Sequence, residues 1–231
     1  MLQKIWRITW KSAMWFLIVT VLWVIAYRWI NPPGTYLMLL RKGQAVFSND
    51  KDKSIYYEWK DLNEMSPYMP LAVMASEDQN FLNHWGFDFA AIQNAVKYNE
   101  THKHKIGAST ISQQVAKNVF LFPARNFIRK GLEAYFTFLI ELLWSKKRIM
   151  EVYLNVVEMN RNRFGIQQGA VYAFNTNAKR LSIGQCARLA AILPGPKKFS
   201  AKAPSGYILM RQTQITQQIY FLGPDVSKAF K

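Results

Sequence analysis

One stretch of the chain, from Ser12 to Ile30, is almost wholly apolar, and Arg28 is its only charged residue. About 20 apolar residues span a hydrocarbon core of roughly 30 Å as a helix, so the stretch predicts a transmembrane helix. Tryptophans at both ends are typical of membrane interfaces, and the sequence NPPG at 31–34 predicts where the helix stops. A cleaved signal peptide fits worse, because bulky residues occupy the place of a small-residue cleavage site. We therefore expect an uncleaved anchor.

The chain has 231 residues, which is enough for this anchor and one further domain. Thirty Lys and Arg against fourteen Asp and Glu give a net charge of +16. Such a surface favours anionic partners, namely phospholipid headgroups, a phosphorylated ligand or nucleic acid. The single cysteine, Cys186, excludes an internal disulfide, and its apolar neighbours indicate a buried thiol.

Beyond the anchor, a polar connector over 31–65 shows no sustained period, and we expect one short strand in it. Apolar residues then recur at helical spacing, and Pro123 and the PGP sequence at 194–196 interrupt the pattern. Helices are predicted over 71–78, 89–98, 108–122, 126–144, 145–159, 165–174, 182–193 and 207–221. The chain is therefore divided into a short tail (1–11), the transmembrane helix (12–30), the connector (31–65) and a mainly α domain (66–231).

Glu77 is a candidate acid or base because it lies in a polar run, SEDQNF, at the end of a predicted helix. Its neighbour Asp78 would point about 100° away on a helix, so we expect one of the two to be structural. The alternative for Glu77 is a solvated carboxylate or the partner of an arginine. His84 and Asp88 follow without a second His or Cys, which makes a metal site weak and favours a hydrogen-bonded packing role for His84.

Ser109, Gln113 and Lys117 recur every four residues, which on a helix puts a hydroxyl, an amide and an ammonium on one face. The loop before them enters the helix at its N-terminus, where free N–H groups favour an anion, although Ser109 or Thr110 could equally be just the helix cap. More positive charge follows at Arg125, Arg129 and Lys130. Together these residues predict a site for a diphosphate.

Glu133 lies four residues after Arg129 and three after Lys130, so the three side chains share a helix face. A surface ion-pair cluster worth a few tenths of a kcal/mol is one interpretation. A catalytic role requires Glu133 to meet Glu77 or the phosphate site across a cleft. Spacing does not decide between the two.

Four ordered motifs run through the domain: ED-x-x-F-x-x-H-x-G-x-D from Glu77, G-x-STI-x-QQ-x-x-KN from Gly107, RK-x-x-E from Arg129 and SK-x-x-I-x-E-x-YLN from Ser145. With these motifs the chain resembles the monofunctional peptidoglycan glycosyltransferases (transglycosylases) of glycosyltransferase family 51. The resemblance covers nearly everything from the anchor to the LPGP sequence at 193–196.

The resemblance implies a lysozyme-like, α-helical glycosyltransferase domain on the periplasmic side of the bacterial cytoplasmic (inner) membrane, held by a single pass. It implies an enzyme of cell wall synthesis that polymerises lipid II, transferring the lipid-pyrophosphate-linked glycan chain to the 4-hydroxyl of lipid II with inversion and β-1,4 bonds. Glu77 would be the general base, and Glu133 the second catalytic carboxylate. The expected substrate-binding residues are Ser109, Gln113, Lys117, Arg125, Arg129 and Lys130.

No tightly bound cofactor and no protein metal site are expected, although a divalent cation (Mg or Mn) is compatible with the substrate diphosphate. The implied partners are lipid II, the nascent glycan strand and the membrane, with other cell wall synthesis or division proteins as further candidates and no nucleic acid. A lipid-linked substrate also places the cleft near the membrane. Four apolar residues are candidates either for core or for a wedge in the interface: Phe120, Leu121, Phe122 and Phe127.

Two other functions remain open from the residues. A lytic enzyme of lysozyme-like fold would cleave existing glycan with one acidic Glu, but it would not need Lys117 and Arg125 near the site. A noncatalytic scaffold could bind anionic lipid or nucleic acid through the net charge. That function leaves Glu77 and Glu133 unexplained.

Overall fold

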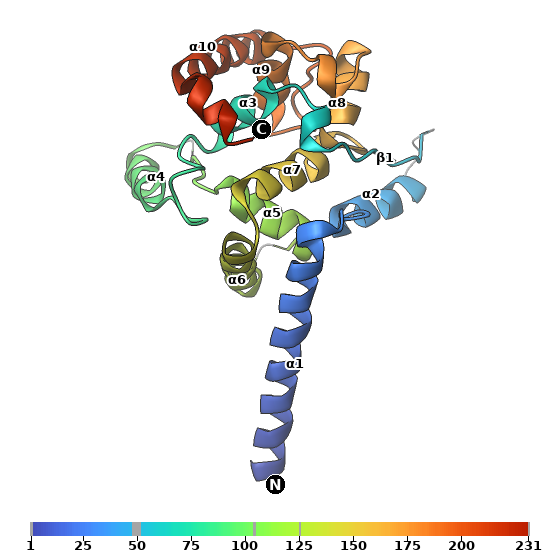
Figure 1. The fold of residues 1–231 in the computed structure, drawn as a ribbon, viewed down its shortest axis with the longest axis vertical. Helices are drawn as coiled ribbons and strands as arrows, with labels where there is room; N and C mark the ends of the chain where they lie inside the picture. The colour runs from blue at the N-terminus through green and yellow to red at the C-terminus, as the bar shows by residue number, and fades with distance from the viewer. Residues whose placement is uncertain (1, 48–51, 104, 125, 231) are drawn as a thin grey trace.

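The computed structural model describes residues 2–47, 52–103, 105–124 and 126–230, and it is mainly helical, as predicted. A long N-terminal helix carries a domain of shorter helices at its C-terminal end (Figure 1). The described helices are α1 (Leu2–Trp29), α2 (Tyr36–Val46), η1 (Leu62–Glu64), α3 (Tyr68–Glu77), α4 (Phe89–Thr101), α5 (Ile111–Phe120), α6 (Phe127–Leu143), α7 (Lys146–Val156), α8 (Gly165–Phe174), η2 (Ala178–Arg180), α9 (Ile183–Ile192) and α10 (Gly206–Lys228). The strands are β1 (Tyr56–Tyr57), β2 (Glu158–Asn160) and β3 (Arg163–Phe164).

α1 contains the predicted apolar helix and ends at Trp29, just before the NPPG sequence. It begins at Leu2, so residues 2–11, which were assigned to a short tail, belong to the same helix. The length and hydropathy of α1 suffice to cross a membrane. Most of its apolar side chains are exposed, including Trp6 and Trp10. Both properties are compatible with a single-pass anchor.

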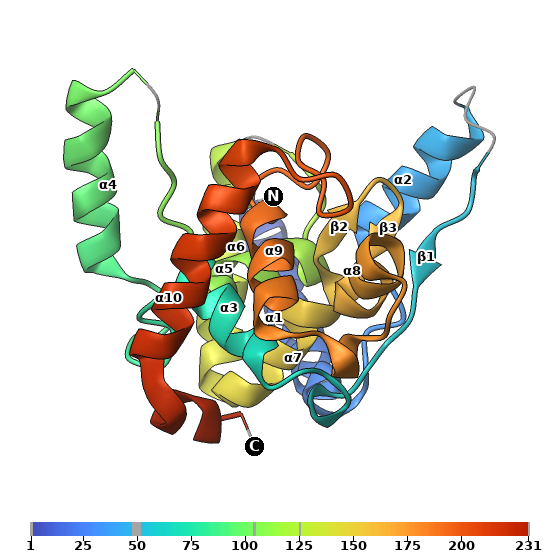
Figure 2. The same ribbon diagram turned by 90° about the horizontal axis from the view of Figure 1, so that it is seen from above.

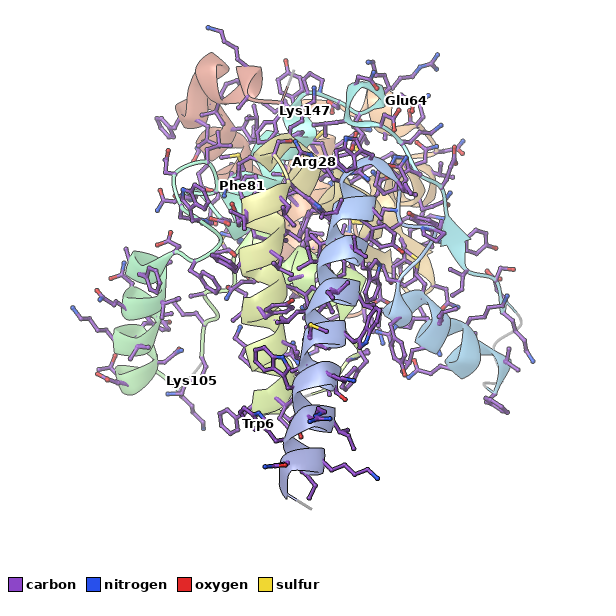
Figure 3. The ribbon with its side chains drawn as sticks, turned by 60° about the horizontal axis from the view of Figure 1, so that its bottom comes forward. Trp6, Arg28, Glu64, Phe81, Lys105 and Lys147 are labelled. Carbon is purple, nitrogen blue, oxygen red and sulfur yellow. The ribbon has the colours of Figure 1, made fainter. Side chains whose placement is uncertain are left out.

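α6 packs along the C-terminal half of α1 (Figure 3). The hydroxyls of Thr20 and Tyr135 share a hydrogen bond of 2.8 Å, and the Trp144 indole donates to the carbonyl of Val24 at 2.8 Å. Thr20 and Val24 lie inside the predicted membrane span. These bonds therefore place the paired part of α6 beside that span. The outer face of α6 is apolar and exposed at Phe127, Ile128, Phe138 and Leu142.

The four residues considered for a membrane wedge divide into two pairs. Phe120 and Leu121 are buried, and Phe120 stacks on Phe136 with a centroid distance of 4.8 Å. Phe122 and Phe127 are exposed. The wedge interpretation is therefore wrong for the first pair, because α6 and α1 cover that part of α5.

The connector contains a helix, α2, which was not predicted. Thr35 caps its N-terminus and accepts a hydrogen bond from the backbone N–H of Met38 at 3.3 Å. Within α2 only Met38 and Ala45 are buried, so the segment has little apolar periodicity to reveal a helix. Packing against α5 supports it instead. The single expected strand is β1.

Two groups of packed helices form the body of the domain (Figure 2). α3 packs against α9 and α10, and α5 packs against both α6 and α7. Every α3 residue from Met69 to Ala75 is buried, which is why this helix is apolar on all sides. By contrast, α4 stands apart from the body, with only Ala95 buried.

α7 fastens the connector to the domain through its polar face. The Asn155 amide donates to the carbonyl of Lys60 and accepts from its N–H, both at 2.8 Å, and Glu151 accepts from the N–H of Leu62 at 3.0 Å. The polar face of α7 is thus bonded to the connector backbone. The helix predicted over 145–159 is shorter in the structure, since α7 ends at Val156 and Glu158 begins β2. β3 pairs antiparallel with β2 and parallel with β1.

Candidate active site

Glu77 is the last residue of α3, where the helix ends beside α5. Its side chain is half-buried, and its carboxylate accepts a hydrogen bond from the Gln114 amide at 2.9 Å. Burial raises the pKa of Glu77, while the bonds from Gln114 and Ser76 and the charges of Arg211 and Lys117 oppose that rise. Glu77 makes no ion pair within the described residues. A carboxylate in this setting has a higher affinity for a proton than a solvated one, which suits a base.

Asp78 is the structural member of the pair, as expected. It is buried, accepts from the backbone N–H of Ile111 at 3.0 Å and contacts Nε2 of His84 at 2.9 Å. These bonds join the end of α3 to the start of α5 and confirm His84 as a hydrogen-bonded packing residue. Because Asp78 fixes both helix ends, it also fixes the position of Glu77 relative to α5.

The predicted stripe of Ser109, Gln113 and Lys117 is only partly formed, because α5 begins at Ile111. Thr110 is the N-cap, and it forms a capping box in which the Gln113 side chain accepts from the backbone N–H of Thr110 at 3.0 Å. Ser109 therefore precedes the helix. Gln113 is 5% exposed and serves the cap. Its neighbour Gln114, rather than Gln113, reaches Glu77.

Two hollows lie along α5. The Glu77 hollow, of about 350 Å³, is formed by the end of α3, the loop before α5 and one face of α4. Its walls carry amides, hydroxyls and carboxylates from Glu77, Gln79, Asn80, Asp88, Asn94, Ser109 and Thr110. Such groups suit the hydroxyl and amide groups of a sugar. Ser109 thus lies with Glu77, although the sequence grouped it with the phosphate residues.

The Lys117 hollow, of about 430 Å³, lies at the other end of α5 and is lined by Lys117, Asn118 and Arg129 together with apolar residues of α2 and of the segment after α5. The Lys117 side chain is exposed at the wall. Desolvation by the surrounding protein lowers its pKa, Arg129 and Lys130 add to this effect, and Glu133 opposes it. The concentration of positive charge fits an anionic ligand.

Glu133 holds two of these cationic side chains, Arg129 and Lys130, in place. It is 3% exposed, and its two carboxylate oxygens accept one hydrogen bond each from Arg129 and Lys130. The carboxylate at the centre of the cluster is buried and Arg129 nearly so, whereas Lys130 is half exposed, so the cluster is more than a surface ion pair. The Nε–H of Arg129 is buried and has no hydrogen-bond partner among the residues that the structure describes.

Arg125, the remaining predicted phosphate contact, lies outside the described residues. Within the described part of the chain there is no group of three or more His, Cys, Asp or Glu side chains that could hold a metal ion. Glu133, which bonds to Arg129 in the wall of the Lys117 hollow, already has both oxygens engaged.

Three residues of the site were missed as site residues: Gln114, Tyr153 and Arg211. Gln114 and Tyr153 belong to the quoted motifs, but a neutral amide and a buried phenol carry no signal of chemistry alone. Arg211 lies on α10, more than 130 residues after Glu77 in the sequence. Only the packing of α10 on α3 brings it near Glu77.

The chain is similar to known proteins over most of its length. The transglycosylase family model matches residues 43–220. A biosynthetic peptidoglycan transglycosylase of Bacteroides thetaiotaomicron is 51% identical over 93% of this chain and 86% of its own length. Proteins of the same name from Pseudomonas syringae pv. syringae and Pseudomonas putida (strain W619) are 49% and 47% identical, over 97% and 96% of this chain and 95% and 94% of theirs.

Proposed function

The chain belongs to the transglycosylase family of peptidoglycan synthesis, and on that premise we propose that it polymerises lipid II into glycan strands. The acceptor is the 4-hydroxyl of lipid II, and the donor is a glycan chain linked to a lipid diphosphate. One observation carries the proposal: α5 connects a hollow with a half-buried carboxylate to a hollow with clustered cations.

In the Glu77 hollow, Glu77 acts as the general base. It takes the proton of the acceptor hydroxyl as the oxygen bonds to the anomeric carbon of the donor, and the bond to the diphosphate breaks with its electron pair leaving on the phosphate oxygen. A positioned base of this kind accelerates attack by about 10² to 10⁴-fold. Attack opposite the leaving group inverts the anomeric centre and gives a β-1,4 bond.

In the Lys117 hollow, Lys117 and Arg129 bind the leaving diphosphate. Negative charge on the diphosphate grows as the bond breaks, so fixed cations stabilise the transition state more than the ground state. Glu133 holds Arg129 and Lys130 in place. Arg125 joins this group through the family resemblance.

A divalent cation, where one takes part, would bind the diphosphate oxygens, since the described residues of the Lys117 hollow offer cations and an amide rather than free carboxylates. It would add positive charge beside Lys117 and Arg129. A crystal structure of the donor complex with Mn²⁺ tests this placement. An ion held mainly by protein carboxylates would contradict it.

The lipid part of the donor has a place next to the diphosphate. An apolar groove of about 650 Å³ lies between the end of α1, α2 and the end of α5, and Leu121 lines both this groove and the Lys117 hollow. Trp23, Tyr27 and Phe120 form part of its wall. A polyprenyl tail entering from the bilayer can therefore follow α1 and bring its diphosphate to Lys117.

We place the domain on the periplasmic side of the bacterial inner membrane, with the outer face of α6 in the outer leaflet. The contact of α6 with the membrane-spanning part of α1 supports this depth. A cysteine introduced at Ile128 should react with a lipid-soluble maleimide but not with a membrane-impermeant one in spheroplasts, whereas one at exposed Lys103 should react with both. Equal labelling of the two sites would contradict the placement.

The decisive experiment uses the full chain in detergent with labelled lipid II. We expect the parent protein to form glycan polymer, Glu77→Gln to lose about 10³-fold or more in rate because the amide cannot take the proton, and Glu100→Gln, an exposed carboxylate of α4, to match the parent. Release of fragments from preformed glycan without polymerisation would favour the lytic enzyme instead. Unchanged polymerisation by Glu77→Gln would remove Glu77 from the mechanism.

A further inference from the structure

Behind Glu77 the structure has a chain of three hydrogen-bonded side chains that ends in the core. The Tyr153 hydroxyl, on α7, donates to the amide oxygen of Gln114 at 3.4 Å. The amide nitrogen of Gln114, on α5, donates to the Glu77 carboxylate at 2.9 Å. Tyr153 is fully buried, so no water replaces its contact.

The direction of these two hydrogen bonds matters because the amide of Gln114 has a donor end and an acceptor end. Burial, together with the negative charges of Glu77 and Asp78, raises the pKa of Tyr153 well above its usual range, so the phenol stays neutral and keeps a proton to donate. A hydroxyl that donates to the Gln114 oxygen leaves the Gln114 N–H groups directed at Glu77. The opposite orientation would direct the amide oxygen at Glu77, and an oxygen can bond only to the protonated carboxyl.

We propose that Tyr153 is a positioning residue of the reaction, holding the Gln114 amide with its N–H toward Glu77 and so keeping the base in its proton-accepting form. The proposal rests on the proposed function, in which Glu77 is the base. Tyr153 does not touch the substrate. It acts through Gln114, and its contribution appears in the protonation of Glu77 rather than in substrate binding.

The other groups around Glu77 do not replace this bond. Arg211 on α10 and Lys117 on α5 act on Glu77 only through space, since neither forms an ion pair with it in the described structure. The Ser76 hydroxyl is 3.5 Å from Glu77 but also 3.2 Å from the carbonyl of Ala190, and it has one proton for both. Asp78, the neighbouring carboxylate, is already bonded to Ile111 and His84.

Tyr153→Phe removes one hydroxyl and little else, which makes it the direct test. The acidic limb of kcat against pH in lipid II polymerisation should move to higher pH, so that kcat on that limb falls roughly tenfold while KM for lipid II stays the same. Tyr56→Phe is the matched control: it also removes a single hydroxyl bonded to a side chain, here Asp52 at 2.9 Å, and Tyr56 lines neither hollow nor the apolar groove. Its profile should coincide with that of the parent.

A double variant identifies the route. In Gln114→Leu the acidic limb should already be moved, and adding Tyr153→Phe should move it little further, because the phenol acts only through the amide. A Tyr153→Phe profile that coincides with the parent overturns the proposal, and so does a loss of kcat that is equal at all pH values and accompanied by a lower melting temperature.

Protonation of Glu77 can also be followed without turnover, which separates this proposal from the proposed function. The infrared carboxyl band that disappears in Glu77→Gln should titrate at higher pH in Tyr153→Phe than in the parent, whatever the substrate. An unchanged midpoint overturns the positioning role even if lipid II is polymerised. A moved midpoint in a protein that does not polymerise lipid II supports the positioning role and overturns the proposed function.

Discussion

Glu77 and Glu133 are two carboxylates that are shielded from solvent to different degrees and have different hydrogen-bond partners. Glu77 accepts its closest hydrogen bond from a neutral amide, at 2.9 Å, and burial raises its pKa. Glu133 is 3% exposed and has a cation on each of its oxygens. The first is left with affinity for a proton, whereas the second is saturated.

The difference teaches how one fold uses the same side chain for two tasks. A carboxylate beside neutral donors can act as a base, because nothing nearby compensates its charge fully. A carboxylate between two cations acts as a brace that fixes their positions for a third, anionic group. On this basis we expect Glu133 to hold Arg129 and Lys130 in place rather than to carry a proton.

After Glu77→Gln, the largest loss of activity is expected for Lys117→Ala. Removing a cation that meets the leaving group should lower kcat/KM for the lipid-linked glycan donor by about 10² to 10³-fold. The KM for the lipid II acceptor should change little, since Lys117 lines the other hollow. Initial rates with donor and acceptor varied separately measure both, and Lys103→Ala, in an exposed loop, is the control. Equal losses for donor and acceptor would show that the hollows are not divided in function.

The pH dependence of the Lys117 contribution has a definite sign. The pKa of Lys117 is lowered, so the parent should lose its charge, and with it donor activity, as pH rises through that lowered pKa. Lys117→Arg keeps its charge throughout this range, so its alkaline limb should lie at higher pH while its acidic limb, set by Glu77, stays in place. An alkaline limb at the same pH in both proteins would assign that titration to another group.

Glu133→Gln should have a smaller effect on rate and a clear effect on stability. Arg129 and Lys130 lose their shared acceptor, so donor kcat/KM should fall by about 10 to 10²-fold, and the free energy of unfolding should fall by a few kcal/mol because buried charge is left uncompensated. Both are measurable in detergent, by kinetics and by thermal melting. If the acidic limb of the pH profile disappeared instead, Glu133 would be the base and the comparison would be reversed.

Ser109→Ala should have the smallest effect and sharpens the boundary between the hollows. Ser109 lines the Glu77 hollow, so loss of its hydroxyl should raise the KM for the acceptor by about two- to fivefold and leave donor use unchanged. The same separated kinetics decide the matter. A selective loss of donor use would restore the grouping of Ser109 with Lys117 that the sequence favoured.

Much of the fold was accessible from the sequence because the relevant signals are local. The apolar run before NPPG predicted α1, and residues at helical spacing predicted α3 to α10 apart from their ends. α2 was missed, because it has few buried residues and relies on α5 for support. The cap of α5 was left open between Ser109 and Thr110, and in the structure it is Thr110, which forms a capping box with Gln113 while the N–H of Ile111 bonds to Asp78.

The features of the candidate site also differ in whether the sequence or the tertiary structure determines them. The sequence by itself determined the membrane-spanning length of α1, the helical character of the domain and the four motifs that carry its family, because length, periodicity and residue order are properties of the chain. Tertiary structure alone decided that Glu77 meets Gln114 rather than Gln113, that Ser109 lies with the base, and that Glu133 is buried between Arg129 and Lys130. These features depend on desolvation and on contacts between distant segments, and neither exists until the helices pack.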